Sequence, residues 1–100
     1  MNNVLSLLGL IYRANKLCIG ENCLANLKKI KFLFIASDAS IKTKERYLKK
    51  CAYYKIPYTL KYSTTKLSNS IGKNNVKVIG LTDVGFAKLV LSKIEEEIDG

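Results

Sequence analysis

The sequence predicts an α/β protein, an α/β/α sandwich of three layers around a sheet of about four strands. Three observations lead to this fold class. Segments with apolar residues at helical spacing alternate along the chain with short apolar runs typical of strands. The run FLFIA at residues 32–36 is continuously apolar, as in a central strand covered on both faces. The chain has 100 residues, 48% of them hydrophobic, and no low-complexity tract, so we expect one ordered domain over residues 1–100.

The first helix is expected at the start of the chain. Asn2 or Asn3 can cap it, and apolar residues then recur on one face as far as Ile11. This helix should end near Arg13, with Asn15 beyond it in the left-handed conformation that asparagine tolerates.

A short strand, a second helix and the central strand come next. Residues 17–19 are apolar and predict the short strand. Gly20 is expected to begin the second helix, which then runs to about Lys29. The apolar run at 32–36 follows as the central strand.

A third helix is predicted over residues 41–55. Asp38 and Ser40 offer side-chain caps for its first turn, and Pro57 ends it. Basic side chains cover most of its surface, as expected for a solvated face. The side chains expected to point inward are Tyr47, Leu48, Cys51 and Tyr54.

The remaining elements complete the alternation. Strands are expected over residues 58–62 and 76–81. Between them, Thr64 or Thr65 caps a short helix that closes at Gly72. A Thr82-Asp83 cap then begins the last helix, whose inward residues are expected to be Phe86, Leu89, Val90 and Ile94.

The charge distribution is the strongest indication of function. The chain has 17 Lys and Arg against eight Asp and Glu, and no His, for a net charge of +9. Residues 1–94 hold all 17 basic residues and only four of the acids, a net +13. Such a field attracts polyanions, either nucleic acid or an anionic membrane. A lysine-rich surface that serves only solubility is the alternative explanation.

Several functional classes are disfavoured by the composition. Without histidine there is no Ser-His or Cys-His catalytic pair, and glycine-rich nucleotide motifs are also missing. Asp38 and Asp83 each follow a predicted strand, but helix capping explains them more simply. Cys18, Cys23 and Cys51 do not form a zinc-ligand pattern. With no visible signal peptide or membrane span, we expect a cytoplasmic protein that is not an enzyme and needs no cofactor or metal.

The start of the predicted second helix, residues 20–22, is a candidate anion site. A helix N-terminus presents unpaired N–H groups, and Gly20 lets another backbone approach. Asn22 can donate and accept hydrogen bonds, which suits the edge of a base. An ordinary cap with a hydrated side chain explains the same residues equally well. The basic residues nearest to this helix are Lys16, Lys28, Lys29 and Lys31.

A second candidate is the polar loop after the short helix. Its residues 72–75 form a plain turn or, alternatively, contact a sugar-phosphate chain through backbone amides and Lys73. Aromatic side chains could also stack on bases, although packing in or beside the core explains them better. These aromatic residues are Tyr53, Tyr54, Tyr58 and Tyr62.

Five stretches of the chain resemble one family of RNA-binding proteins. These stretches are LLGLIYRANKL, IGENCLANLKK, FLFIASDAS, LSNSIGK and GLTDVGFAKLV, in that order. They resemble the ribosomal proteins L seven-Ae and L thirty-e, especially the small bacterial YlxQ-type members. The resemblance implies an α/β/α sandwich with a mixed sheet of about four strands that binds kink-turn RNA. A kink-turn is a duplex bent sharply beside tandem G·A pairs, where the bend opens guanine edges that an A-form duplex hides.

The resemblance also implies which residues contact RNA. The family motif is glycine, any residue, asparagine, glutamate, two further residues and lysine. Gly20 and Asn22 match it, whereas Cys23 stands in place of the glutamate and Asn26 in place of the lysine. The implied RNA-binding residues are Lys16, Gly20, Glu21, Asn22, Cys23, Asn26, Lys28, Lys29, Ile71, Gly72, Lys73 and Val76.

The resemblance assigns a role to each group of these residues. Asn22 and the Gly20 amide would contact the G·A base edges. Phosphates would be neutralised by Lys16, Lys28 and Lys29. The extruded loop nucleotide would be cradled by Ile71, Gly72, Lys73 and Val76.

We therefore expect a monomeric protein that binds kink-turn or similarly bent structured RNA. The RNA would be ribosomal RNA or a ribosome-associated transcript, with the ribosome as a further partner and no membrane partner. The alternative is a protein-interaction adaptor on the ribosome or the RNA-processing machinery that kept the fold with weakened RNA recognition. Cys23 and Asn26 favour the adaptor, and the net +13 over residues 1–94 favours RNA binding.

Overall fold

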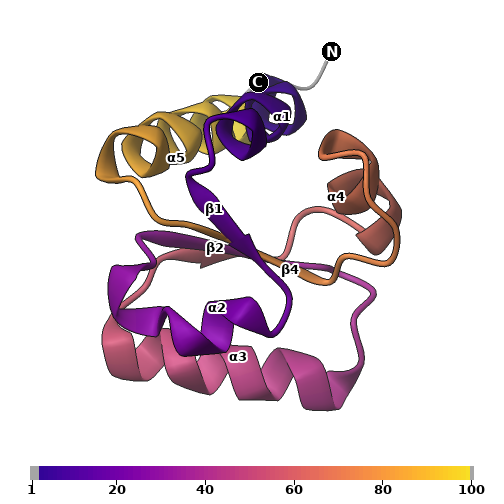
Figure 1. Cartoon of the computed structure of the whole chain (residues 1–100), viewed down its shortest axis with the longest axis vertical. Coiled ribbons are helices and arrows are strands. Elements are labelled where there is room, and N and C mark those ends of the chain that lie inside the picture. Colours follow the sequence, from indigo (N-terminus) through magenta and orange to yellow (C-terminus); the bar gives the residue numbers. More distant parts are fainter. Residues whose placement is uncertain (1–2, 100) are drawn as a thin grey trace.

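The computed structural model describes residues 3–99, with helices on both faces of one sheet (Figure 1). The predicted alternation of helices and strands is confirmed, while Asn2, a predicted cap, lies outside the described residues. The elements are α1 (Asn3–Arg13), β1 (Leu17–Ile19), α2 (Asn22–Ala25), the 3-10 helix η1 (Leu27–Lys29), β2 (Phe32–Ile35), α3 (Ile41–Tyr54), β3 (Tyr58–Thr59), α4 (Thr64–Ser70), β4 (Val78–Leu81) and α5 (Val84–Asp99).

The sheet is mixed and has the strand order β1-β4-β2-β3. Strand β4 runs antiparallel to both β1 and β2, and β3 is parallel to β2. Every residue of β2 and β4 is buried, as the apolar run of β2 predicts for a central strand. Gly80 of β4 pairs with Cys18, and a Cβ at Gly80 would lie 2.9 Å from the Cys18 Sγ. Glycine therefore allows β1 and the chain after α2 to pack closely on β4.

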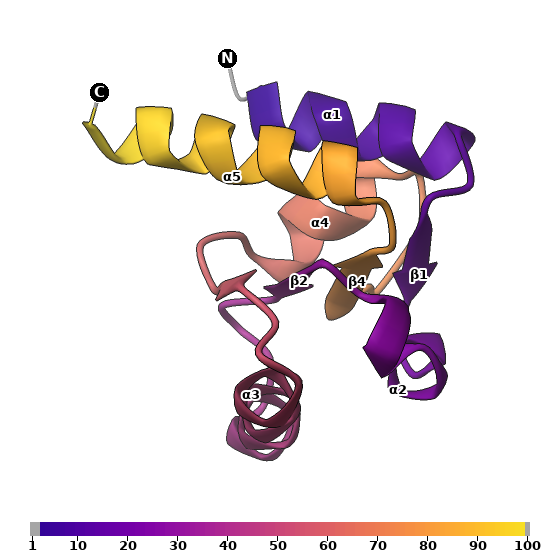
Figure 2. The same cartoon turned by 90° about the vertical axis from the view of Figure 1, so that its left-hand side faces the viewer.

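Helices lie on both sides of the sheet, which gives the predicted three layers (Figure 2), and each face of the sheet carries its own core. Phe32 and Phe34 face one way and pack beneath α1, α4 and α5. Leu33 and Ile35 alternate to the other face and pack against α2, η1 and α3. Within residues 3–99, no helix combines the length and apolar composition needed to cross a membrane.

Side-chain caps mark several helix starts. Ser40 caps α3 by accepting a hydrogen bond from the Thr43 N–H at 3.1 Å. Asp83 similarly accepts from the Phe86 N–H at 2.9 Å at the start of α5. Asp38, the other predicted α3 cap, instead accepts from both the backbone N–H and the hydroxyl of Thr64. Its carboxylate therefore joins the loop after β2 to the start of α4.

Some predicted boundaries are wrong. Instead of one helix from residue 20 to residue 29, the chain forms the four-residue α2, a break at Asn26 and the short η1. The strand predicted over 58–62 is only β3, and β4 begins two residues later than predicted. Ser63, rather than either threonine, caps α4. In α5 the buried positions are Ala87, Val90 and Ile94, so the predicted inward Leu89 is exposed.

Asn15 has the predicted positive φ, at 60°. In α3 the predicted inward residues are confirmed, because Tyr47 and Cys51 are buried and Leu48 and Tyr54 pack partly buried beside them. The layer formed by α2, η1 and α3 thus presents its polar side chains away from the sheet.

Candidate nucleic-acid interface

The turn that joins β1 to α2, residues 20–22, is tied to the core through Gly20. Gly20 has a φ of +61°, and a Cβ added there would meet no atom within 4 Å. Its N–H donates to the Val78 carbonyl oxygen at 2.9 Å. Its carbonyl oxygen accepts from the Cys23 N–H at 3.0 Å and from Tyr47 Oη at 3.3 Å. The Gly20 amide is therefore not free for RNA bases, which corrects the prediction for that group.

Asn22 supplies the free polar groups of this turn. Its side chain is exposed and makes no hydrogen bond to the described part of the protein. The backbone N–H groups of Glu21 and Asn22 likewise have no acceptor among residues 3–99, because they precede the first helical hydrogen bond. Within the described chain, three donor groups, the Asn22 side-chain carbonyl and the Glu21 carboxylate of these two residues are therefore unpaired. This is a compact set for reading the edge of a base.

The side chains at the two positions that depart from the family motif make hydrogen bonds within the protein. Cys23 is 0% exposed, and its Sγ lies 3.1 Å from the Cys18 Sγ in a hydrogen bond between the thiols. That hydrogen bond and burial raise the pKa of Cys23, so the thiol stays neutral. The Cys23 side chain points into the core and cannot contact RNA, which corrects its assignment. Asn26 Nδ2 donates to the Asn22 carbonyl oxygen at 2.8 Å and so stabilises the end of α2.

The loop after α4 exposes only its middle. Residues 72–75 are exposed, whereas Ile71 and Val76 are 6% and 5% exposed and pack in the core. Those two apolar side chains anchor the loop and do not form an open cradle for a nucleotide, contrary to expectation. The Ser68 Oγ accepts from the Val76 N–H at 2.8 Å, which fixes the return of the loop into β4. Lys73 Nζ lies 5.7 Å from the centre of the Tyr12 ring on α1.

The turn at 20–22 and the loop at 72–75 lie beside each other. The hydrogen bond from Gly20 to Val78 joins the turn to the start of β4, two residues after Val76. Figure 1 shows the orange chain after α4 descending into β4 next to the end of β1. Two segments about 50 residues apart in the sequence are thus brought together by β1–β4 pairing.

The predicted phosphate-binding lysines do not all share that location. Lys16 precedes β1, and its carbonyl oxygen accepts from the Thr82 N–H at 3.0 Å. It is therefore at the opposite end of β1 from Gly20, roughly 13 Å away along an extended strand. Lys28 and Lys29 are exposed on η1, beyond the end of α2. They line a hollow with Tyr54, near the C-terminal end of α3.

The tyrosines divide by exposure. Tyr62 is 2% exposed and its ring packs against Phe34, so it does not stack on bases. Tyr53 is 79% exposed, and its ring centre lies 4.9 Å from that of Tyr54 in an edge-to-face arrangement. Tyr58 is half exposed on the edge strand β3. Only the Tyr53 ring at the end of α3 is thus open to stacking along most of its surface.

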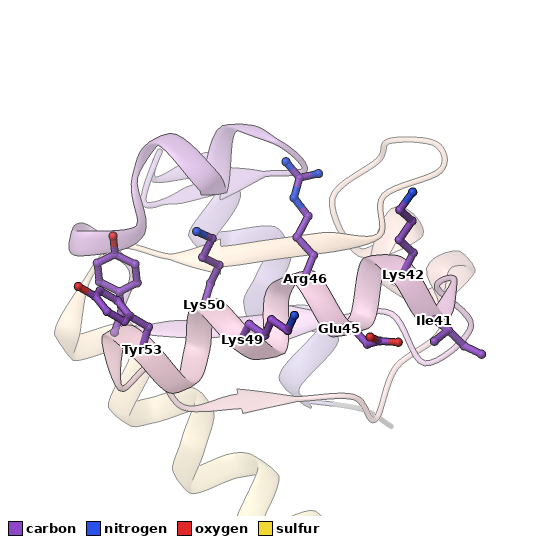
Figure 3. Close-up of a pocket in the computed structure, with 8 residues that line it drawn as sticks. Ile41, Lys42, Glu45, Arg46, Lys49, Lys50 and Tyr53 are labelled. Atoms are coloured by element: carbon purple, nitrogen blue, oxygen red, sulfur yellow. The ribbon is translucent and has the colours of Figure 1, made fainter.

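The sequence predicts an ordinary solvated surface for the outer face of α3, but this helix also contacts the turn. Tyr47 on α3 donates to Gly20, and an open hollow of about 1000 Å³ runs along the outside of this helix (Figure 3). The spacing of four between Lys42, Arg46 and Lys50 is the signal in the sequence that could have identified a continuous row. The residues that line the hollow are Ile41, Lys42, Glu45, Arg46, Lys49, Lys50, Tyr53 and Tyr54.

These features define a small, basic α/β/α protein whose surface carries a polar turn, a polar loop and a cationic helix. RNA-binding protein YlxQ from Enterococcus faecium is 39% identical over 99 residues, which cover 96% of this chain and 91% of that protein. RNA-binding protein YlxQ from Bacillus subtilis (strain 168) is 38% identical over 94 residues, 89% of this chain and 92% of that protein. The chain therefore belongs to the YlxQ family of RNA-binding proteins.

Solved structures share the fold. A protein of unknown function from Bacillus halodurans C is 35% identical with a TM-score of 0.87, covering 95% of this chain and 99% of that one. The Giardia lamblia 15.5kD RNA binding protein has a TM-score of 0.78 at 20% identity, covering 93% of this chain and 85% of that one, which shows the fold alone. No protein-family model matches the chain.

Proposed function

We propose that this protein binds RNA, and that its ligand is a kink-turn or a similarly bent structured RNA. Two relatives at 38% and 39% identity are named RNA-binding proteins. The observation that carries the proposal is the Gly20–Val78 hydrogen bond, which joins the turn at 20–22 to the start of β4, three residues after the loop at 72–75. Both segments expose unpaired polar groups on a chain with a net charge of +13 over residues 1–94.

Base recognition falls to the turn. The Asn22 side chain and the free N–H groups of Glu21 and Asn22 offer donors and an acceptor to the edges of the G·A pairs. Gly20 acts indirectly, because its left-handed conformation and internal hydrogen bonds fix the direction in which those groups point. The bent RNA makes base edges accessible that a regular A-form duplex encloses.

The surrounding cations and the loop at 72–75 would contact the RNA backbone. Lys28 and Lys29 would neutralise phosphates on one side of the turn. On the other side, Lys73 and the backbone N–H groups of residues 74 and 75 would hold the loop nucleotide, since those of Gly72 and Lys73 already donate to α4 carbonyl oxygens. Ribosomal RNA or a ribosome-associated transcript is the proposed source. We place the protein in the cytoplasm, which suits its three free cysteines.

An adaptor function that uses the fold for protein contacts is the second candidate. It is favoured by Cys23 and Asn26, because neither supplies the free glutamate or lysine side chain of the family motif. The adaptor does not require RNA binding at all. Direct measurement of RNA affinity against salt concentration therefore separates the two functions.

The experiment compares a kink-turn RNA with a straight duplex of equal length by fluorescence anisotropy. We expect tighter binding of the kink-turn and a linear fall of log K with log salt, by 0.7–0.9 per phosphate neutralised. Asn22→Ala should weaken kink-turn binding by about 1–3 kcal/mol and reduce the preference for it, since the variant loses base contacts. Asn69→Ala on α4, also exposed, is the matched control and should leave both affinities unchanged.

The outcomes are distinct. No measurable RNA affinity at low salt would support the adaptor. Unchanged discrimination by Asn22→Ala, with RNA binding retained, would remove Asn22 from base recognition.

A further inference from the structure

The outer face of α3 carries a row of three cations. Lys42, Arg46 and Lys50 are spaced four residues apart, so they repeat about every 6 Å and span about 12 Å along the helix. In Figure 3 their side chains project from the same side of α3, the side on which the purple chain of α2 lies. All three are exposed. We call these residues the α3 row.

The charges of the α3 row are not neutralised by the protein. Within the described residues, none of the three cations lies within 4.0 Å of a carboxylate. Glu45 is the single acidic residue lining the hollow, and Figure 3 shows it on a different side of α3 from the row. A solvated helix face gains stability when opposite charges stand four residues apart. The α3 row has three positive charges at that spacing and gains no such stability.

The row continues the candidate interface. Tyr47, adjacent to Arg46 in the sequence, donates its hydroxyl to the carbonyl oxygen of Gly20 at 3.3 Å. That hydrogen bond holds the middle of α3 against the turn at 20–22, and burial raises the pKa of Tyr47. The middle of the row adjoins the segment where base recognition is proposed.

The chemistry of the row suits phosphates better than a protein surface. A nucleic-acid duplex carries one negative charge per about 1.7 Å of its axis, so a 12 Å row meets several phosphates. Protein interfaces, by contrast, are depleted in lysine and centred on apolar anchors. The row has no apolar residue between its members on the same side of the helix. The exposed Tyr53 at its end adds a ring on which a base can stack.

On the basis of the RNA binding proposed above, we propose that the α3 row holds the phosphate backbone of the duplex that flanks the bend. The turn at 20–22 then reads the bent segment, and α3 extends the contact along the neighbouring helical arm. This assigns three lysine and arginine side chains outside the family motif to RNA binding.

The test compares two triple variants with equal loss of charge. The first replaces the row, with Lys42→Gln, Arg46→Gln and Lys50→Gln. The control replaces one arginine and two lysines that are exposed on the opposite helical layer, with Arg13→Gln, Lys66→Gln and Lys88→Gln. Circular dichroism melts establish that both variants are folded. Anisotropy with a kink-turn RNA at several salt concentrations gives the affinity and the salt slope of each.

For the row variant we expect the salt slope to fall by about 2–3, because three phosphate contacts are lost at 0.7–0.9 each. The control should change the slope by less than about 0.5. The difference in salt slope between wild type and the row variant should also disappear when the flanking duplex arm of the RNA is trimmed to a few base pairs. The wild type itself should then bind more weakly.

Other results overturn the proposal in distinguishable ways. Equal slopes for the two variants, with wild-type binding intact, would refute the role of α3 and leave the proposed function standing. Wild-type protein that binds neither the full-length nor the trimmed RNA would refute both the role of α3 and the proposed function. Binding of a poly-glutamate peptide that the row variant loses, with its RNA slope unchanged, would assign α3 to an acidic protein partner.

Discussion

Gly20 provides a direct test of how the turn is held. Gly20→Ala is expected to lower the free energy of unfolding by about 1–2 kcal/mol, the cost of placing an L-residue in the left-handed region. The φ of +61° is the whole source of this cost, because a Cβ there meets no atom within 4 Å. The backbone hydrogen bonds to Val78 and from Tyr47 involve no side-chain atom of Gly20 and survive the change.

Urea unfolding followed by circular dichroism measures this cost. Gly20→Asn is the matched comparison, since asparagine tolerates the left-handed conformation and should lose only about half as much stability. The urea m-value should not change, because neither variant alters the surface exposed on unfolding. Equal losses for alanine and asparagine would show that the cost does not arise from the backbone conformation. A loss above about 3 kcal/mol would show that position 20 makes a contact that the structure lacks.

Two further predictions concern packing and pH. Gly80→Ala should destabilise the fold by about 1–3 kcal/mol, because the new Cβ would lie 2.9 Å from Cys18 Sγ and from Ile30 Cδ1. In a Cys18→Ala background, Gly80→Ala should lower the free energy of unfolding by less. If urea unfolding shows that the losses of the two single variants simply add, the clash with Cys18 Sγ is refuted. The hydrogen bonds from Thr64 lower the pKa of Asp38 below 3.8, so its carboxylate stabilises the fold at neutral pH and that contribution is lost as pH falls. Asp38→Ala should therefore be less stable than wild type near pH 7, with a difference that shrinks below about pH 4; a constant difference would refute the role of the charge.

Local signals in the sequence predicted most of the fold correctly. The apolar run of β2, the left-handed Asn15 and the caps formed by Ser40 and Asp83 each depend on neighbouring residues alone. Such features follow from backbone sterics and short-range hydrogen bonds, which a sequence displays directly.

The second helix was predicted too long because its apolar spacing continues through the break. Cys23, Leu27 and Ile30 are all buried and keep helical spacing. Their spacing does not reveal that Gly20 pairs with Val78 or that the Asn26 side chain bonds back to Asn22. The tertiary bond to β4 and the local side-chain bond of Asn26 accompany the shortening of α2, and they override the apolar pattern.

The candidate site was predicted in part. Asn22 and the loop at 72–75 are exposed and adjacent, as the resemblance implied, but the side chains at 23, 71 and 76 are buried. The apolar character of these three residues was a signal for burial that the family motif obscured. The α3 row was overlooked because a charged helix face is most often only hydrated, and its position beside the turn depends on the tertiary fold.

The hydrogen bonds made by the Gly20 backbone have a consequence for the kinetics of recognition. Hydrogen bonds fix its N–H to β4 and its carbonyl oxygen to Tyr47, so the direction of the turn is set within the folded protein. Under the RNA binding proposed above, we expect little ordering of this segment on association, and therefore a small entropic cost on the protein side. Folding of the RNA into its bent shape would then limit the rate, and conditions that prefold the RNA should accelerate binding more than any change that stiffens the protein.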